Sequence, residues 1–430
     1  MSEEKLVPKL RFIDEPWGSQ KLGKICKITM GQSPSSENYT EDSRDTVLIQ
    51  GNADLINGKV VPRIFTSEIT KLSYPGDIIL TVRAPVGDLA INEFKSCIGR
   101  GVCSIKGNKF IYYFLQSLKD KHVWERLSQG STFESINSND IKNLNLKIPS
   151  KTTQESISDF LTLIDAKIEL LEKKHESYID FKKYLIQQIF AQKLRFTSSN
   201  DDWKTVKIKD IFDERNEKGF MDLELLSVTL KDGVIKRSEI EAKDNSNENK
   251  TNYKHVMPED IVYNSMRMWQ GASGVSSYEG IVSPAYTILI PKNVYSKFFG
   301  YYFKTAELIH QFKKYSQGLT SDTWNLKYPL ISEIKIKIPS IEEQKEITKI
   351  FETIDMKLEI IQNNLEEMAI FKKGLLQQMF VYTHIFLNFC AKICCIKYFL
   401  KFKYDWYFFS SNSILLSTEV KKFAIFSCSS

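Results

Sequence analysis

The sequence contains no charge-free apolar run long enough to cross a membrane. Its first residues, MSEEKLVPKLRFIDEPW, also lack the apolar core of a signal peptide. Cysteine is scarce as well: the seven that occur are an odd number without the spacing of a disulfide framework. We therefore expect a soluble, cytoplasmic protein that makes no membrane contact.

The common catalytic motifs are also absent. There is no GxxxxGK[ST] phosphate loop, no HExxH, no paired CxxC and no GxSxG. SPAY (283–286) lacks the Asn and the paired prolines with which adenine methyltransferases hold a flipped base. IGRGVCS (98–104) only half resembles a nucleotide loop, since it precedes a strand-like run instead of opening a helix. We expect a non-catalytic binding protein with no metal site.

The excess of basic residues is too small to indicate a partner by itself. The net charge is +6, but residues 381–430 hold six lysines against Asp405 and Glu419, which leaves +2 for residues 1–380. Any argument for nucleic acid must therefore come from where the basic side chains lie. The hydrophobic content of 42% and the length of 430 residues indicate a globular chain of two or three domains.

The chain repeats itself. FKKYLIQQIF (181–190) returns as FKKGLLQQMF (371–380), and the same offset of 190 aligns KIPSKTTQESI with KIPSIEEQKEI and LIDAKIEL with TIDMKLEI. Looser matches precede these at drifting offsets: Trp17 with Trp203, YPGDII with MPEDIV, YYF (112–114) with YYF (301–303), and SQG (128–130) with SQG (316–318). This pattern indicates a tandem duplication, strict in one half and diverged in the other.

The repeat is circular in arrangement. KLRF follows the first decapeptide at 193–196 and also stands at 9–12, before the first copy begins. After the second decapeptide it is missing. We expect the end of the second copy to meet, at the amino terminus, the same type of segment that follows the first copy.

Each strict half predicts a long helix. Thr152 or Thr153 is a plausible N-cap for a helix reaching Phe190, with Glu155 in its first turn and no Gly or Pro inside. Apolar residues recur at alternating steps of four and three, which is the seam of a coiled coil, although His175, Lys182 and Lys372 interrupt it. The alternative is two unrelated amphipathic helices, each docked on its own domain. The residues expected to pair the helices are Ile157, Leu161, Ile164, Ile168, Leu171 and Leu185 in the first, and Ile347, Phe351, Ile354, Leu358, Ile361 and Leu375 in the second.

The diverged halves predict two modules of mixed sheet and helix. Short apolar runs such as DIILTV (77–82) and YTILI (286–290) alternate with turn residues, and each module then has a helical stretch, at 110–118 and 298–312. The expected fold class is α/β (α+β): two such modules separated by two long antiparallel coiled-coil helices, with an internal pseudo-two-fold repeat. The expected segments are 1–16, packing near the helix ends; 17–150, module one; 151–196, helix one; 197–340, module two; 341–380, helix two; and 381–430, an atypical tail.

Loops in both modules combine basic residues with amide or aromatic ones. DNA groove readout uses this chemistry, because Arg binds guanine edges, Asn or Gln binds adenine, and hydroxyl groups bind phosphates. Each residue alone is more often a solvated surface group, but sets repeated in both modules favour readout. The candidate DNA contacts are Gln32, Asn52, Arg83, Arg100, Ser131 and Thr132 in the first module, and Lys254, Arg267, Trp269, Gln270, Thr320 and Ser321 in the second.

The chain closely resembles the specificity subunit of type I restriction–modification enzymes. The resemblance covers residues 5 to 380 and is carried by PGDIILTVRAPVGDLAI (75–91), by SQGST ahead of NLNLKIPS (143–150), and by repeated helices opening near a Gln-Glu pair (154–155 and 343–344). It implies that each module is a target recognition domain reading one half of a split double-stranded DNA sequence. It also implies that the helices act as a spacer and as the dock for two methyltransferase subunits, which restriction subunits join. No cofactor is implied for this chain; S-adenosylmethionine, ATP and Mg are implied for its partners.

The tail, residues 381–430, departs from the family pattern. It contains no Gly or Pro, holds four of the seven cysteines, and its CAKICC run lacks a usual zinc spacing. We interpret it as a carboxy-terminal extension from a shifted or read-through frame, with exposed apolar surface as the consequence.

Two other functions remain open from the residues. A stand-alone two-headed DNA-binding regulator predicts tight, sequence-specific binding by the isolated chain. A coiled-coil protein-interaction adaptor predicts no salt-dependent DNA affinity. A specificity subunit predicts stoichiometric methyltransferase partners.

Overall fold

The computed structural model describes residues 8–128, 135–195, 202–241, 246, 249–320 and 323–380. Contacts divide the chain into two units, one of residues 1–172 and 363–430 and the other of residues 173–362. Each unit combines one mixed β-sheet module with a segment of each of two long helices, α5 (Lys151–Phe190) and α10 (Ile341–Met379). The predicted fold class is confirmed. The residues of the tail, including the CAKICC run, lie outside the described residues.

The module of the first unit is built on two sheets that share one core. A six-stranded sheet has the order β2-β12-β9-β10-β6-β5, a five-stranded sheet has the order β3-β7-β4-β11-β8, and β1 pairs with β13. The shared core includes Ile49 from one sheet and Ile79 from the other. The strands are β1 (Gly18–Lys21), β2 (Lys27–Met30), β3 (Tyr39–Thr40), β4 (Thr46–Ile49), β5 (Leu55–Ile56), β6 (Lys59–Val60), β7 (Ile64–Thr66), β8 (Leu72–Ser73), β9 (Ile78–Thr81), β10 (Leu89–Ile91), β11 (Ser96–Ile98), β12 (Val102–Lys106) and β13 (Asn145–Ile148). The helices are α1 (Leu22–Ile25), α2 (Lys109–Asp120), α3 (Val123–Ser128) and α4 (Ser138–Lys142), with 3-10 turns η1 (Ser36–Asn38) and η2 (Asn52–Asp54).

The module of the second unit repeats part of this frame. Its four-stranded sheet, β15-β22-β19-β20, corresponds in order to β2-β12-β9-β10, and β14 pairs with β23 as β1 pairs with β13. Two further pairs are β16-β17 and β18-β21. The strands are β14 (Lys204–Lys207), β15 (Phe212–Glu214), β16 (Leu226–Thr229), β17 (Gly233–Lys236), β18 (Lys254–Val256), β19 (Ile261–Asn264), β20 (Ser273–Val275), β21 (Gly280–Val282), β22 (Tyr286–Pro291) and β23 (Lys335–Ile338). The helices are α6 (Ile208–Ile211), α7 (Ser296–Tyr302), α8 (Ala306–Tyr315) and α9 (Tyr328–Ile331), with 3-10 turns η3 (Arg237–Glu239) and η4 (Met268–Gln270).

The central strands follow directly from the sequence. The residues of β9, IILT, are all buried, as expected of a strand covered on both faces, and its neighbour β12 begins with four buried residues. After the sheet, Asn108 caps α2 by accepting a hydrogen bond from the amide of Ile111. The helical stretch expected at 298–312 is divided into α7 and α8, because Thr305 adopts an extended conformation and caps α8.

The first long helix begins earlier than its predicted N-cap, whereas the second begins at residue 341, as expected. In α5 the amide of Thr153 donates to Oγ of Ser150 at 3.3 Å, and in α10 the amide of Glu343 donates to Oγ of Ser340 at the same distance. The capping group is therefore the serine of each Pro-Ser pair, and not Thr152 or Thr153. None of the helices in the described ranges is long and apolar enough to cross a membrane.

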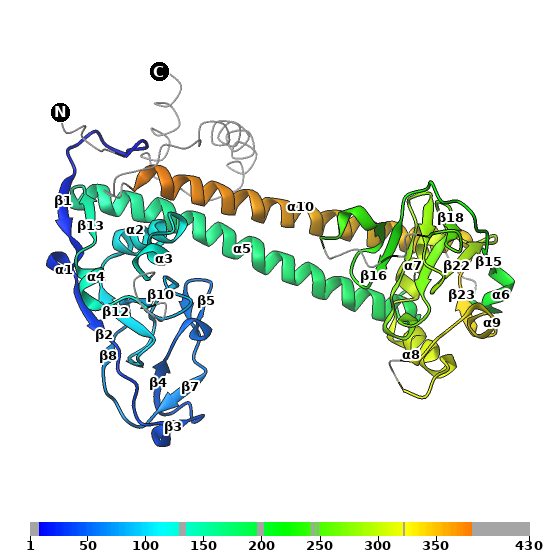
Figure 1. Ribbon diagram of the computed structural model, residues 1–430, viewed down its shortest axis with the longest axis horizontal. Helices are drawn as coiled ribbons and strands as arrows, with labels where there is room; N and C mark the ends of the chain where they lie inside the picture. The colour runs from blue at the N-terminus through cyan, green and yellow to red at the C-terminus, as the bar shows by residue number, and fades with distance from the viewer. Residues whose placement is uncertain are drawn as a thin grey trace. The chain divides into compact units, whose positions relative to one another are not determined.

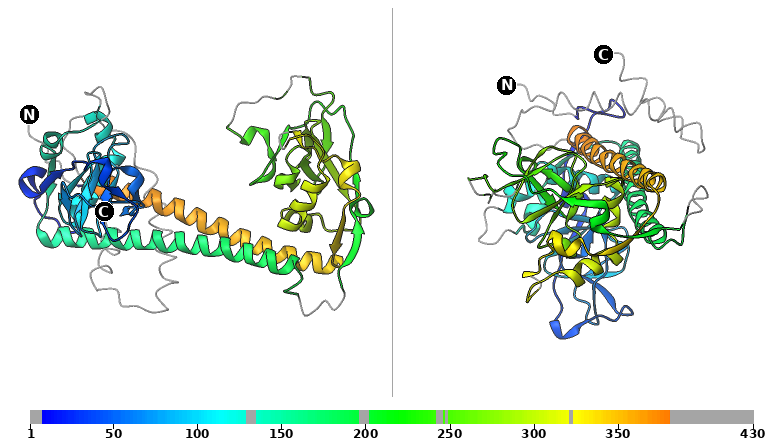
Figure 2. Two further views of the ribbon diagram at one scale, coloured as in Figure 1. Left: turned by 90° about the horizontal axis from the view of Figure 1, so that it is seen from below. Right: turned by 90° about the vertical axis from the view of Figure 1, so that its right-hand side faces the viewer.

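In each unit a segment of α5 lies along a segment of α10 (Figure 1). Within the second unit the ammonium of Lys357 lies over the ring of Tyr178. Lys182, farther along α5, forms an ion pair with Asp355, which precedes Lys357 in α10. The two segments therefore run antiparallel. The same side-by-side packing is visible from below (Figure 2). Of the twelve residues expected to pair the helices, Ile168 and Leu358 are half-buried, and the other ten are buried.

The structure corrects one alignment of the repeat. The alignment of YYF (112–114) with YYF (301–303) equates Tyr112 with Tyr301. In the structure Tyr113 and Tyr301 play the same part, because each donates its hydroxyl hydrogen to an aspartate of a long helix, at 2.8 and 2.7 Å. The alignment of the two YYF runs is therefore wrong by one residue. Tyr113 of α2 corresponds to Tyr301 of α7, and Tyr112 corresponds to Gly300.

Candidate nucleic-acid interface

A polar pocket of about 360 Å³ opens on the first module. Three of the predicted contacts line it, and they come from three separate loops: Asn52 after β4, Arg83 after β9 and Arg100 between β11 and β12. The fold therefore brings together residues that are far apart in the sequence. The full lining is Ser33, Gln50, Gly51, Asn52, Arg83, Ala84, Arg100 and Gly101.

Close approaches of the backbone shape this pocket. A Cβ at Gly101 would lie 2.1 Å from the carbonyl oxygen of Gln50, and one at Gly31 would lie 2.0 Å from that of Gly99. Any larger residue would force these segments apart. The glycines of the IGRG run therefore have a structural role beside the pocket.

Hydrogen bonds to main-chain amides fix the loops. The carboxylate of Asp54, which is buried, accepts from the amide of Gln50 at 2.7 Å and from that of Gly51 at 3.1 Å. The amide of Arg100 donates to Oγ of Ser33 at 3.1 Å. The main chain is thereby held, while the side chains of Asn52 and Arg100 remain exposed.

The pocket carries uncompensated positive charge. Arg83 and Arg100 are both exposed, and no carboxylate in the described part of the chain forms an ion pair with either guanidinium. Asp54 lies 3.9 Å from Arg63. Two free guanidinium groups beside amide side chains can bind an anion or the acceptor edge of a base.

The loop that carries Arg83 is held against residues 135–136, just before α4. The amide of Ile136 donates to the carbonyl oxygen of Val82 at 3.0 Å, and Arg83 and Ser135 form a β-bridge. Within the loop, Oγ1 of Thr81 donates to the carbonyl oxygen of Pro85 at 2.8 Å. The segment that carries Arg83 thus lies beside the segment that precedes α4.

The corresponding loops of the second module also meet. The amide of Leu326 donates to the carbonyl oxygen of Ser265 at 2.9 Å. Trp269 packs edge-on against Trp324, with ring centroids 5.2 Å apart, and its indole nitrogen donates to the carbonyl oxygen of Met266. Trp269 therefore anchors the two loops to each other and is half-buried.

Arg267 and Gln270 flank this aromatic pair and are exposed, as a DNA contact requires. Lys313, from α8, adds a basic group that the sequence reading missed, since its ammonium lies 5.3 Å from the centroid of the Trp324 ring. Ser33 and Gln50 were also missed, although Ser33 is next to the predicted contact Gln32 and Gln50 is two residues before the predicted contact Asn52. Lys313 carried no such signal, because it sits on an ordinary amphipathic helix.

The remaining candidates are placed differently. Lys254 is largely buried, and its ammonium donates to the carbonyl oxygen of Tyr286 at 3.0 Å and lies 3.6 Å from Glu214, so its charge is not presented to a ligand. Gln32 is exposed but does not line the pocket. Thr320 is exposed, and its amide donates to Oγ1 of Thr323 at 3.1 Å. Ser131, Thr132 and Ser321 lie outside the described residues.

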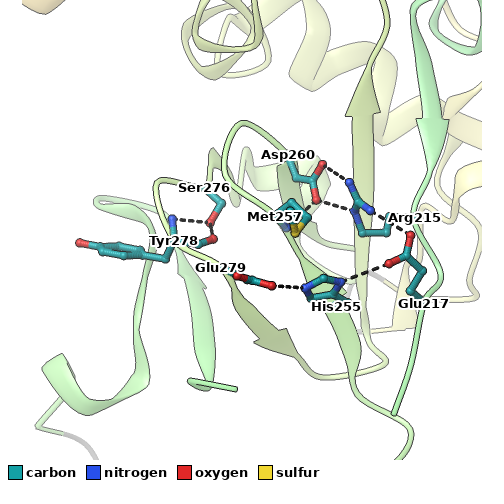
Figure 3. A network of polar contacts seen from close by, with 8 residues as sticks. All are labelled: Arg215, Glu217, His255, Met257, Asp260, Ser276, Tyr278 and Glu279. Carbon is teal, nitrogen blue, oxygen red and sulfur yellow. Dashed lines mark hydrogen bonds and ion pairs between the residues drawn. The ribbon is translucent and has the colours of Figure 1, made fainter. Parts of the chain in front are cut away.

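A polar network supports the sheet of the second module (Figure 3). Arg215 bonds Asp260 through Nε at 2.7 Å, and the buried ring of His255 lies between Glu217, at 3.2 Å, and Glu279, at 3.0 Å. The hydrogen bond from His255 is the main cause that lowers the pKa of Glu217. The network joins β18 to the segments before and after it. No group of three His, Cys, Asp or Glu side chains within the described ranges could hold a metal ion.

Two related modules with polar, partly basic loop surfaces, carried on a pair of long helices, define a tandem recognition protein. The chain belongs to the family described as the type I restriction modification DNA specificity domain, which matches residues 14–177 and 200–369.

Relatives and a solved structure carry the same description. Over 191 residues the chain is 36% identical to the "Putative type I restriction enzyme MjaX specificity subunit" of Methanocaldococcus jannaschii, a stretch that covers 43% of this chain and 44% of the relative. The MjaVIII specificity subunit of the same organism is 23% identical over 296 residues, covering 61% of this chain and 68% of that one. The type I restriction-modification S subunit from M. genitalium superposes with a TM-score of 0.55 at 17% identity, covering 88% of this chain and all of that one, which supports the fold. The chain thus spans less than half the length of the MjaX subunit.

Proposed function

We propose that this chain is the non-catalytic, cytoplasmic DNA-recognition subunit of a type I restriction–modification complex. Each module reads one half of a bipartite, asymmetric double-stranded DNA site. The two long helices set the gap between the half-sites and dock two methyltransferase subunits. Adenine methylation and ATP-dependent cleavage belong to the methyltransferase and restriction subunits, which bind S-adenosylmethionine, ATP and Mg, whereas this chain binds none of them.

The observation that carries the proposal is the pocket of the first module. Arg83 and Arg100 present free guanidinium groups, which bind the O6 and N7 acceptors of guanine in a bidentate manner. Gln50 and Asn52, on the same rim, offer the paired donor and acceptor that adenine requires. The hydroxyl of Ser33 is available for a phosphate.

Differences between the modules support an asymmetric site. The second module presents Arg267 and Gln270 beside the pair Trp269 and Trp324, and Lys313 completes this surface. Its depression of about 570 Å³ lies elsewhere, and its lining, which includes Asp222 and Glu224, contains none of the predicted contacts. Two surfaces of such different chemistry would read different bases.

Exposed apolar side chains on the long helices support the docking role. In the first unit Leu163 and Leu170 of α5 and Ile370 of α10 are between 51% and 61% exposed. In the second unit the exposed apolar residues are Phe181, Tyr184, Met356 and Ile360. Large apolar groups clustered on a helix surface indicate a protein partner, and the repeat predicts one partner for each copy.

The test is to express the chain with and without methyltransferase subunits and to sequence the methylated bases of the host DNA. We expect stoichiometric co-purification and methylation of a split motif, with a gap near one helical turn of roughly 34 Å. Sequence-specific binding by the chain alone would favour the regulator instead. An absence of salt-dependent DNA affinity would favour the adaptor.

A further inference from the structure

Two lysines interrupt the apolar seam of the long helices at equivalent positions, Lys182 and Lys372, and the proposed readout does not use them. In the first unit Lys372 of α10 lies 2.6 Å from Asp165 of α5. The carboxylate of Asp165 also accepts the hydroxyl hydrogen of Tyr113 of α2 at 2.8 Å. The ammonium lies 5.7 Å from the centroid of the Tyr113 ring. One lysine, one aspartate and one tyrosine thus join both long helices to the module.

The second unit repeats this triad with the roles of the helices exchanged. Lys182 now comes from α5 and pairs with Asp355 of α10. Tyr301 of α7 donates its hydroxyl hydrogen to Asp355 at 2.7 Å, and the ammonium lies 5.1 Å from the centroid of its ring. Burial raises the pKa of Tyr301, as it does that of Tyr113, so both phenols stay protonated and act as donors.

Each lysine is largely withdrawn from water, with 23% of the Lys182 side chain and 14% of the Lys372 side chain exposed. A partly buried ammonium needs a carboxylate opposite it. Among registers that differ by whole heptads, and so keep the phase of the apolar seam, only the observed one gives both lysines a carboxylate. A polar residue at a seam position fixes the register of a coiled coil for this reason.

The sequence shows which ion pairs would be lost if α10 shifted along α5. If α10 moved by seven residues in one direction, Lys182 would face Thr348 and Asp165 would face Leu365. Moved by seven in the other direction, Lys182 would face Gln362 and Asp355 would face Ile189. Either slip leaves a charged group against an uncharged one, although the apolar seam alone would tolerate it.

The two tyrosines also fix the position of each module on the long helices. Tyr113 lies in α2, the helix that follows β12, and neighbouring hydrogen bonds also hold α2 against α5. Nδ2 of Asn108 donates to Gln154 at 2.9 Å. In the second unit Nζ of Lys297 bonds Glu352 of α10 at the same distance.

We propose that the triads Tyr113–Asp165–Lys372 and Tyr301–Asp355–Lys182 are positioning residues that fix the register of α5 against α10 and the seat of each module on them. They thereby determine the number of base pairs between the two half-sites. Only this last step rests on the proposed function.

The test compares the variant K182M/K372M with K183M/K373M in the full chain. The control removes the adjacent, exposed lysines of the same two decapeptides, so the change in charge is identical. Spin labels are attached at Glu176 of α5 and Glu359 of α10, both exposed and in the second unit, after the four tail cysteines are replaced by serine. Pulsed electron paramagnetic resonance measures the distance between the labels.

We expect K182M/K372M to add a second distance population, because a slip of seven residues moves one helix by about 10 Å along the other. The control keeps the single distance of the unmodified chain. The reversed pairs K182D/D355K and D165K/K372D, combined in one chain, restore that distance. If K182M/K372M does not fold, the reversed-pair chain decides by the same measurement. A single unchanged distance in K182M/K372M, or a shifted one in the reversed-pair chain, overturns the proposal.

The link to DNA is read separately, by sequencing methylated sites in cells that also express the methyltransferase subunits. K182M/K372M is expected to methylate sites whose gaps differ by about three base pairs, with unchanged half-sites. Unchanged gaps despite a second distance population would overturn the step from register to spacing. If the unmodified chain directs no methylation, the proposed function fails, whereas the distance measurement still decides the role of the triads.

Discussion

The main-chain amide of Lys9 donates a hydrogen bond to the carbonyl oxygen of Gln378, at 3.0 Å. The amide of Lys193 makes the same bond with Gln188 at 2.9 Å, and these residues are the equivalents of Lys9 and Gln378 in the other copy. After the first long helix the KLRF segment follows directly in the chain. After the second, the amino terminus supplies it, as the circular arrangement of the repeat predicts.

This contact predicts that the amino-terminal segment stabilises the last turn of α10. Phe12 is half-buried and packs edge-on against Phe160 of α5, with ring centroids 5.5 Å apart. We expect F12A to lower the local free energy of opening at residues 375–379 by about 1–2 kcal/mol, because apolar contact is lost. Hydrogen exchange of these amides measures it. I13A is the control, since Ile13 is 48% exposed, and equal effects of the two would contradict the assignment.

A second prediction concerns the two free guanidinium groups of the pocket. R83Q and R100Q, each tested in the complex with methyltransferase subunits, should weaken binding to the target by about 1–3 kcal/mol, roughly 5- to 150-fold, and relax discrimination at one base pair. Fluorescence anisotropy with single-base variants of one half-site measures both effects.

R44Q is the matched control for this pair. It removes the same charge from the same module, but Arg44 is bound to Asp42 and lies outside the pocket. We expect only a small loss of affinity that is uniform across sequences. A loss of discrimination in R44Q as large as that in R83Q would show that charge alone, and not the pocket, accounts for the effect.

A third prediction tests the close approach of the backbone at the pocket. G101A should destabilise the module by about 1–3 kcal/mol, because its Cβ would collide with the carbonyl oxygen of Gln50. G51A should change stability by less than about 0.5 kcal/mol, since no atom lies within 4 Å of the added Cβ. Exchange of the Val82 amide reports the difference, as it donates to the carbonyl oxygen of Gly101 at 2.8 Å.

The strict half of the repeat made much of the fold predictable. An offset of 190 without gaps and an apolar seam in steps of four and three indicate long helices. This prediction does not depend on the structure of the modules. The strands around Ile79 and Ile288 were also visible as apolar runs, because each is buried on both faces. The pairing order was not predictable, since β11 and β4 are neighbours through contacts that are nearly fifty residues apart.

The candidate interface was predictable only as a set of loops. Which loops meet depends on hydrogen bonds such as that from Ile136 to Val82, and no local pattern encodes them. The prediction that Lys254 is a free basic group was wrong. Its partners, the carbonyl group of Tyr286 and the carboxylate of Glu214, come close to it only in the folded module. The seam lysines were seen as defects, and their partners Asp165 and Asp355 became evident only from the register.

The last prediction concerns Lys121, whose ammonium donates to the carbonyl oxygen of Phe380 at 2.7 Å, beyond the end of α10. Burial lowers the pKa of Lys121 to about 8, from a usual value of 10.5. Between these values the unfolded chain holds a proton that the folded chain has released, so the stability of the first unit should rise with pH across this window. The rise should be at most about 3 kcal/mol and should disappear in K121M. Urea titrations at several pH values, compared between each variant and the unmodified chain, measure it. K119M is the control, because Lys119 is exposed and pairs with Asp88, and a slope lost equally in both variants would contradict the role of Lys121.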